Sequence, residues 1–251
     1  MTRSVHERVT EKLHKVLARA GFGSRRHIEQ WIQDGRVTVN GEVARIGARV
    51  GPEDRLQVDG RPVEATRPVA ARVLMYNKPL GEVVTRSDPE GRPTVFSALP
   101  PLRTGRWITV GRLDINTTGL ILFTNDGELA NLLMHPAANL DREYIARVYG
   151  DVDEEKIRRL ESGVPVGGRP ASFKSIVPLG KASSANRSYR VVLTEGRNRE
   201  VRHLWEAVGC TVSRLKRVRF GPVALPRDLN PGRWRELTGG ELKALTGGGR
   251  A

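Results

Sequence analysis

Apolar residues recur at helical spacing near the start of the chain. Between residues 11 and 20 they lie three or four positions apart, which predicts a helix that ends at a Gly-Phe-Gly break. Ser24 is a favourable N-cap for a second helix. Asn40-Gly41 then gives a strong hairpin signal between two alternating segments. Residues 11–60 therefore predict a small domain of two helices on a small sheet, and the polar residues 1–10 before it are expected to be disordered.

The pattern changes after this segment. Residues 61–71 contain two prolines and no apolar periodicity, so we interpret them as a linker. In residues 72–238, short strand-like runs alternate with turns and short helices, which predicts an α+β fold with a mixed or antiparallel central sheet flanked by helices and loops. Residues 239–251 predict a short helix and a flexible C-terminal tail. The chain thus predicts two folded domains.

One polar turn in the larger domain lies between two predicted strands. Residues 106–110 alternate like a strand, residues 120–124 form a short apolar run, and the turn between them has glycine at both ends. Asp114 lies in this turn, on a loop held between two rigid elements, where binding and catalytic groups are often found. On the local pattern alone, an aspartate that only makes an Asx turn is the favoured interpretation.

Composition adds a partner to this picture. The 251 residues are 38% hydrophobic, which is enough for a core, and their formal net charge of +14 indicates a polyanionic partner, nucleic acid before an anionic membrane surface. No apolar run has the length of a membrane span or resembles a secretion signal. Cys210 is the single cysteine, so an intrachain disulfide is excluded, and we expect this side chain to be buried. Five scattered histidines suggest no metal site, and we expect a cytoplasmic protein without a metal.

Positive charge gathers in two places. In the small domain the basic residues surround the turn between the helices, and they are Lys15, Arg19, Arg25, Arg26 and Arg36. They fit a solvated surface, but their position around a helix N-terminus favours contacts with phosphates. In the larger domain Arg197, Arg199 and Arg202 crowd the start of a predicted helix. The helix dipole disfavours cations there, so we expect an anion or a carboxylate nearby.

Several of these motifs resemble one family. The segment Gly111-Arg112-Leu113-Asp114-Ile115-Asn116-Thr117-Thr118-Gly119-Leu120 resembles the catalytic motif of pseudouridine synthases. The segments Leu13-His14-Lys15-Val16-Leu17-Ala18-Arg19-Ala20-Gly21 and Gly35-Arg36-Val37-Thr38-Val39-Asn40-Gly41 resemble an S4 RNA-binding domain. Together the motifs resemble the S4-containing branch that modifies ribosomal RNA, from about Glu11 to about Leu237.

The resemblance implies an activity and its requirements. It implies isomerisation of a uridine in large-subunit (23S) ribosomal RNA to pseudouridine, on a base flipped out of the RNA. This reaction needs no cofactor and no metal. The implied partner is that RNA, with no membrane and no obligatory protein partner. Two alternatives remain: the same chemistry at a different ribosomal RNA site, and a non-catalytic S4-domain factor in ribosome assembly.

The resemblance also implies roles for single residues. Asp114 is the implied nucleophile, at uracil C6 or at ribose C1′, and Arg202 pairs with it and keeps it ionised. Tyr144 stacks on the target base, and Leu215 lies against that base. The implied RNA contacts are Arg112, which helps fill the vacated position in the RNA, together with Arg197, Arg199 and the basic residues of the small domain. A Lys-Pro-x-Gly turn at Lys78 resembles a turn near the family's active cleft, and an ordinary turn fits it equally well.

Overall fold

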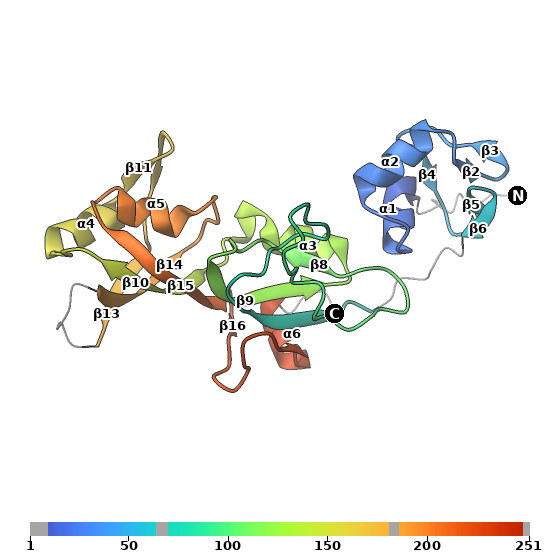
Figure 1. Cartoon of the computed structure of the whole chain (residues 1–251). Coiled ribbons are helices and arrows are strands. Elements are labelled where there is room, and N and C mark those ends of the chain that lie inside the picture. The colour runs from blue at the N-terminus through green and yellow to red at the C-terminus, as the bar shows by residue number, and fades with distance from the viewer. Residues whose placement is uncertain (1–9, 64–69, 181–185, 248–251) are drawn as a thin grey trace, which may run out of the picture. The chain divides into compact units, whose positions relative to one another are not determined.

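A computed structural model describes residues 10–63, 70–180 and 186–247 of the chain (Figure 1). The described residues form two compact units. Residues up to Ala70, together with Pro101–Trp107, form the first unit, and Ala71–Pro100 with Ile108 onwards form the second. The predicted disordered N-terminus lies, except for its last residue, outside the described residues.

The first unit contains two helices and a four-stranded sheet of order β3-β2-β5-β6. Its helices are α1 (Leu13–Arg19) and α2 (Arg25–Gln33). The strands of the sheet are β2 (Val37–Val39), β3 (Glu42–Val43), β5 (Leu56–Val58) and β6 (Arg61–Val63). A separate strand pair joins β1 (Glu11–Lys12) to β4 (Arg49–Val50). Leu17, Ile28 and Val37 have no exposed surface and form the centre of the core.

Local signals account for most of this unit. The Ser24 side chain accepts a hydrogen bond from the backbone N–H of His27 and caps α2. Asn40 and Gly41 both have positive φ, as a two-residue hairpin turn requires. The predicted linker differs at its start, because residues 61–63 pair with β5 as strand β6. Its alternation is short and interrupted by proline, which hid the strand from the sequence analysis; residues 64–69 lie outside the described residues.

The second unit is built on a mixed sheet. Its strand order is β13-β14-β10-β15-β9-β7-β17, with β8 paired to β9 and β16 paired to β15. The strands are β7 (Val73–Lys78), β8 (Ile108–Val110), β9 (Thr117–Thr124), β10 (Arg142–Tyr149), β13 (Ser175–Leu179), β14 (Asn186–Leu193), β15 (Thr211–Phe220), β16 (Val223–Ala224) and β17 (Trp234–Glu236). Within this described sheet, β9 and β15 are parallel and the other pairs are antiparallel. The predicted α+β class with a mixed sheet is confirmed.

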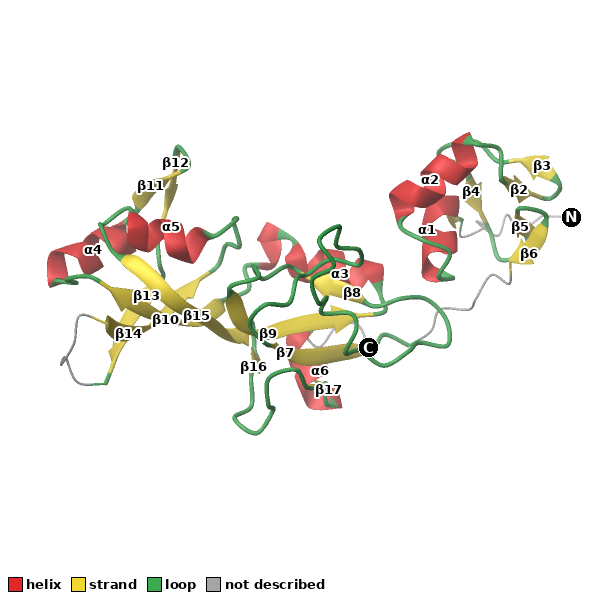
Figure 2. Ribbon diagram, viewed as in Figure 1, coloured by secondary structure: helices red, strands yellow, loops and turns green. Residues whose placement is uncertain are grey.

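Short helices connect the strands of the second unit. They are α3 (Gly127–Met134), the 3-10 helix η1 (Pro136–Ala138), α4 (Glu154–Ser162), α5 (Glu200–Glu206) and α6 (Gly239–Leu245). Asp126 caps α3 by accepting from two backbone N–H groups. Helices α4 and α5 lie along one side of strands β13, β14, β10 and β15 (Figure 2). A hairpin of β11 (Val164–Val166) and β12 (Arg169–Ala171) follows α4 along the chain, forms a two-stranded sheet of its own, and was not predicted.

Two cores hold the helices of this unit in place. Trp205 of α5 packs against Tyr189 of β14 and against Phe173, and all three side chains are buried. Leu245 of α6 is buried in a second cluster together with Leu122 of β9, so the C-terminal helix is part of the second unit. Cys210 is 2% exposed, and its predicted burial is therefore confirmed.

Candidate functional site

A cavity of about 1040 Å³ opens in the second unit. The polar turn of residues 111–117, strands β10 and β15, and the segment before α5 provide its walls. Six residues singled out from the sequence line it: Arg112, Asp114, Tyr144, Arg197, Arg199 and Leu215. The structure therefore brings together groups that lie about a hundred positions apart in the chain.

The turn that carries Asp114 is held by its backbone. The N–H of Thr117 donates to the carbonyl oxygen of Asp114 at 3.0 Å, and the N–H of Gly81 donates to that of Ile115 at 3.1 Å. A Cβ added at Gly119 would lie 2.2 Å from the backbone oxygen of Arg217, so only glycine lets β9 approach β15 this closely. The half-buried Asp114 side chain is thus presented to the cavity from a restrained loop.

Lys78 supports this turn from strand β7. Its side chain has no exposed surface, and its Nζ donates to the backbone oxygens of Thr117 at 2.9 Å and Pro79 at 3.0 Å. Burial lowers the pKa of Lys78 to about 8, while the carboxylates of Glu82 and Asp114 oppose that shift. The turn beginning at Lys78, which the sequence left open between two interpretations, therefore contacts the loop of Asp114.

Arg202 also contacts this loop. It is 6% exposed on α5, and it donates from Nη1 to the carbonyl oxygen of Val212 at 2.6 Å and from Nη2 to that of Asn116 at 3.0 Å. Burial and the neighbouring Arg199 lower the pKa of Arg202, whereas Asp114 raises it. The two charges therefore interact, although no ion pair within 4.0 Å joins them among the described residues. A direct pair of Arg202 with Asp114 stays a prediction.

Neighbouring strands provide the opposite wall. Tyr144 on β10 is 8% exposed and Leu215 on β15 is 6% exposed. Tyr144 pairs in register with Arg217, a buried arginine of the cavity wall that the sequence analysis did not single out. Two register shifts between β10 and β15 break the simple alternation of β15. Alternation alone therefore does not identify Arg217 as a position that faces inward.

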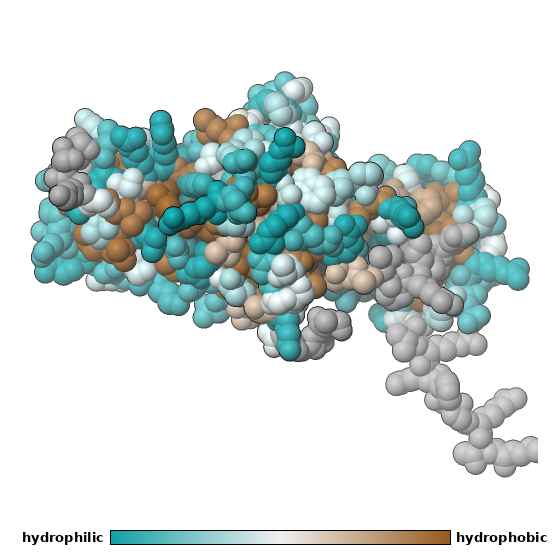
Figure 3. All heavy atoms as spheres, turned by 90° about the horizontal axis from the view of Figure 1, so that it is seen from below, coloured by the Kyte–Doolittle hydropathy of each residue, from teal (hydrophilic) through white to brown (hydrophobic). Residues whose placement is uncertain are grey.

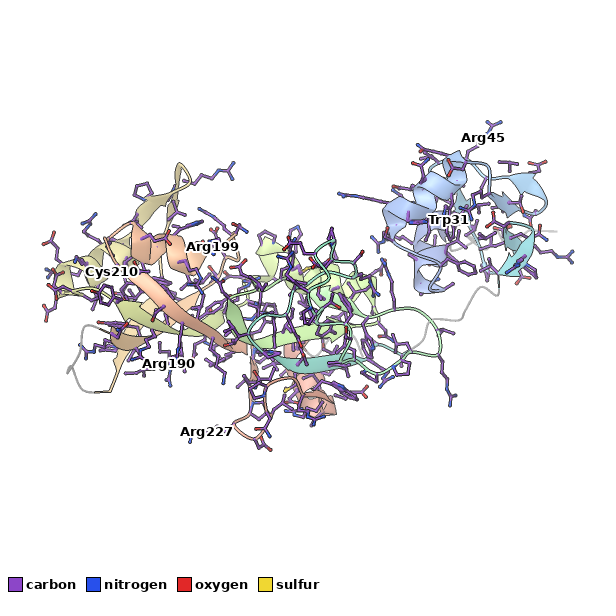
Figure 4. The ribbon with its side chains drawn as sticks, viewed as in Figure 1. Trp31, Arg45, Arg190, Arg199, Cys210 and Arg227 are labelled. Carbon is purple, nitrogen blue, oxygen red and sulfur yellow. The ribbon has the colours of Figure 1, made fainter. Side chains whose placement is uncertain are left out.

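The residues before α5 form the charged margin of the cavity. Arg199 adopts a left-handed conformation with φ of 51°, which is costly for an arginine and is often found at functional sites (Figure 4). Arg197 pairs with Glu195 and lies 3.8 Å from Glu200, which provides the carboxylate expected near this helix start. Burial raises the pKa of Glu200. Arg199 forms no comparable ion pair within the described parts of the chain.

The basic residues of the first unit differ in whether a carboxylate of the same unit pairs with them. Arg25 and Arg26 are exposed on α2. Arg19 pairs with Glu11 at 2.7 Å, and Arg36 pairs with Asp59 at 2.5 Å. The Arg36 guanidinium also lies 4.6 Å from the ring centroid of Trp31, which is labelled in Figure 4. The predicted basic surface around the helix turn is therefore present, but two of its members have carboxylate partners within the unit.

Hydrophilic and hydrophobic side chains are interspersed on the face shown in Figure 3. None of the described helices is both long enough and apolar enough to cross a membrane. Within the same residues, no group of three or more histidine, cysteine or acidic side chains is placed to hold a metal ion.

Arg106, which belongs to the first unit, is a cation that the sequence analysis missed, and burial and then Arg25 lower its pKa.

Known proteins resemble this chain along most of its length. The family described as RNA pseudouridylate synthase matches residues 72–207, and the S4 domain family matches residues 11–56. The chain is 59% identical to a ribosomal large subunit pseudouridine synthase B from Pseudomonas aeruginosa, across 96% of this chain and 63% of that protein. It is 55% identical to the protein of that name from Salmonella typhi, across 95% of this chain and 83% of that protein. A crystal structure of a pseudouridylate synthase aligns with a TM-score of 0.67 at 26% identity, covering 93% of this chain and 99% of that one.

Proposed function

The chain belongs to the RNA pseudouridylate synthase family, and we propose that it converts one uridine of large-subunit (23S) ribosomal RNA to pseudouridine. The observation that carries this proposal is Asp114, held on a restrained turn at the wall of a cavity that Tyr144 and Leu215 also line. Relatives that are more than half identical to this chain over the aligned residues bear the name ribosomal large subunit pseudouridine synthase B. That name supports large-subunit RNA as the substrate.

In this proposal Asp114 is the nucleophile. Its carboxylate serves attack at uracil C6 and attack at ribose C1′ equally well. Arg202 holds the turn in place, because it donates a hydrogen bond to the backbone oxygen of Asn116, two residues after Asp114. Its positive charge also interacts with the Asp114 carboxylate. Buried Lys78 adds a second positive charge near Asp114. Both cations attract the negative charge of the Asp114 carboxylate.

The target base enters the cavity after it flips out of the RNA, at a cost of a few kcal/mol. The Tyr144 ring stacks on the uracil, and Leu215 on the adjacent strand contacts it from the β15 side of the cavity. Arg112 is exposed at the cavity, where its long side chain helps fill the space left in the RNA. Arg197 and Arg199 bind backbone phosphates at the margin.

The first unit binds structured RNA through its phosphates. Its contacts are Lys15, Arg19, Arg25, Arg26 and Arg36. Arg25 and Arg26 contribute most, because they are exposed and form no ion pair within the described residues. Arg19 and Arg36 contribute less, because Glu11 and Asp59 neutralise part of their charge. This unit determines where the enzyme binds, and the cavity determines what reacts.

A pseudouridine map of ribosomal RNA tests the proposal. RNA is compared from cells with the protein, without it, and with Asp114→Asn in its place. Loss of one large-subunit pseudouridine in the last two strains supports the assignment. A lost site in other RNA would favour the same chemistry on a different target. An unchanged map in both strains would instead favour a non-catalytic role in ribosome assembly.

A further inference from the structure

Two further arginines, Arg142 and Arg217, lie on the cavity wall. Arg217 of β15 is 3% exposed, and its Nε donates to the backbone oxygen of Leu120 at 2.7 Å. Its buried Nη2 has no hydrogen-bond partner in the described structure. A buried guanidinium with an unsatisfied donor is costly unless it has an anion to bind.

Arg142 of β10 stands beside it. The guanidinium carbons of Arg142 and Arg217 lie 5.1 Å and 5.4 Å from the centroid of the same ring, that of Phe220. Arg142 donates to the backbone oxygens of Leu140 and Thr194. Burial is the main cause that lowers the pKa of Arg142; Arg217 lowers it further, and Tyr144 and Glu200 raise it. Within the described residues neither arginine has a carboxylate within 4.0 Å.

The position of this pair is specific. Arg142 lies two residues before Tyr144 on β10, and Arg217 pairs in register with Tyr144 across the β10–β15 ladder. Both arginines line the cavity that holds Asp114. Arg219, two residues further along β15, is different, because its Nε donates to Glu143 at 2.9 Å. The buried arginine of this strand that has no carboxylate partner therefore lies at the cavity, beside the residue that stacks on the base in the proposed function.

We propose that Arg142 and Arg217 form an anion subsite that binds a negatively charged oxygen of the target nucleotide. This inference rests on the proposed function. One source of such an oxygen is the phosphate next to the target uridine, which paired arginines bind well. The other is a carbonyl oxygen of the uracil ring when the ring becomes anionic during the reaction.

The anionic ring arises in either route of attack. When Asp114 adds to C6, a C–O bond forms, the electron pair of the C5–C6 double bond moves into the C4–C5 bond, and the electron pair of the C4=O double bond moves onto O4. When Asp114 adds to C1′, an ester C–O bond forms, the N1–C1′ bond breaks, and its electron pair stays on the uracil. The ring thus carries one negative charge in both cases, and no oxidant or further reactant is needed. A fixed cation beside the ring lowers the energy of that state.

Three substitutions and a matched control test the subsite. Arg142→Gln and Arg217→Gln remove the charge, Arg217→Lys keeps the charge without the planar fork, and Arg219→Gln removes a compensated arginine from the same strand. Thermal unfolding, affinity for a large-subunit RNA fragment, and the single-turnover rate at saturating enzyme are measured for each. We expect the two glutamine variants at the subsite to lose about tenfold or more in affinity or in rate, with partial recovery in Arg217→Lys. Arg219→Gln should match the wild type in both.

RNA affinity and the saturated single-turnover rate together distinguish the phosphate from the uracil ring as the source of the bound oxygen. Weaker binding with a salt dependence flatter by about one unit, and an unchanged saturated rate, assigns the phosphate. Unchanged binding with a slower saturated rate assigns the uracil ring. Affinity and rate equal to wild type in folded Arg142→Gln would overturn the subsite, and Arg142→Gln decides alone if Arg217→Gln does not fold. A wild type that binds the fragment but forms no pseudouridine would contradict the proposed function instead, and the affinity comparison would still decide for or against the phosphate.

Discussion

The Nζ of Lys78 lies 2.9 Å from the backbone oxygen of Thr117, and the Lys78 side chain has no exposed surface. This contact joins the end of β7 to the start of β9 and restrains the turn that carries Asp114. A lysine in this position provides donors for several carbonyl oxygens at once, which an apolar residue cannot do. It also places a charge in a site where burial disfavours the charged form.

The first prediction concerns the pH dependence of stability that Lys78 contributes. Its pKa falls from 10.5 to about 8 in the folded protein, so between these values the unfolded chain binds more protons than the folded one. The Lys78 contribution to the free energy of unfolding therefore rises with pH, by on the order of 3 kcal/mol across the whole window. Denaturant unfolding of wild type and Lys78→Met gives their free energies of unfolding at pH 7 and pH 10. The difference between the two proteins should be larger in favour of wild type at pH 10. A difference that does not depend on pH would contradict the lowered pKa.

The second prediction concerns the nucleophile. Asp114→Asn keeps the size of the side chain and the backbone hydrogen bond from Thr117, so fold and RNA affinity should stay close to wild type. Turnover should fall by about three orders of magnitude or more, because an amide is a poor nucleophile. Tritium release from 5-labelled uridine in the RNA substrate measures it. Release at the wild-type rate would remove Asp114 from the mechanism.

The third prediction tests the close approach of β9 and β15. Gly119→Ala introduces a Cβ that would lie 2.2 Å from the backbone oxygen of Arg217, at a φ of 97°. We expect a loss of roughly 4 kcal/mol in unfolding free energy, or failure to fold. Gly81→Ala is the matched control, because its φ is 88° and its added Cβ meets nothing within 4 Å. The control should lose only about 1 kcal/mol. Equal losses in the two variants would mean that backbone conformation alone is responsible.

The local parts of this fold were predictable because their signals are local. Ser24 caps its helix as predicted, and Asn40-Gly41 forms the predicted hairpin turn. The parallel pairing of β9 with β15 was not predictable, because a register between strands about a hundred residues apart leaves no local pattern. Arg217 faces the cavity through that pairing and the neighbouring bulges, and a single strand read by itself does not show this.

The candidate site was predictable to a similar degree. The turn of Asp114 stood out through its two glycines and flanking strands, and the family resemblance supplied the roles of Arg202 and Tyr144. Lys78 was harder to identify, because a lysine that ends an apolar strand is also typical of an ordinary exposed turn. Its burial follows from the loop that folds over it, which is a tertiary contact.

The fourth prediction distinguishes the arginines of the first unit. Arg25 and Arg26 are exposed without an ion pair among the described residues, whereas Arg36 pairs with Asp59. Replacing Arg25 and Arg26 together with alanine should flatten the salt dependence of RNA binding by about two units of slope. Arg36→Ala, the comparison, should change it by less than one. Titrations of the RNA fragment at several salt concentrations measure the slope. An equal change in slope for each arginine would mean that the ion pair of Arg36 with Asp59 opens when RNA binds.

The last prediction separates charge from geometry at Arg202. Alanine would leave the carbonyl oxygens of Val212 and Asn116 without their donor and remove a charge that interacts with Asp114. Lysine restores the charge but not the planar fork that reaches both oxygens. We therefore expect activity to fall from wild type to Arg202→Lys to Arg202→Ala, with the alanine variant slower by roughly two orders of magnitude or more.

The pH dependence decides whether Arg202 acts on Asp114 or instead binds a phosphate of the RNA. With less positive charge nearby, a carboxylate takes up its proton at higher pH, so the acid limb of the single-turnover profile should move to higher pH in Arg202→Ala and stay closer to wild type in Arg202→Lys. If Arg202 only bound a phosphate, both variants would bind RNA more weakly and keep the wild-type profile at saturating enzyme. Superimposable profiles for wild type and Arg202→Ala would therefore exclude the interaction with Asp114 as the reason this arginine is needed.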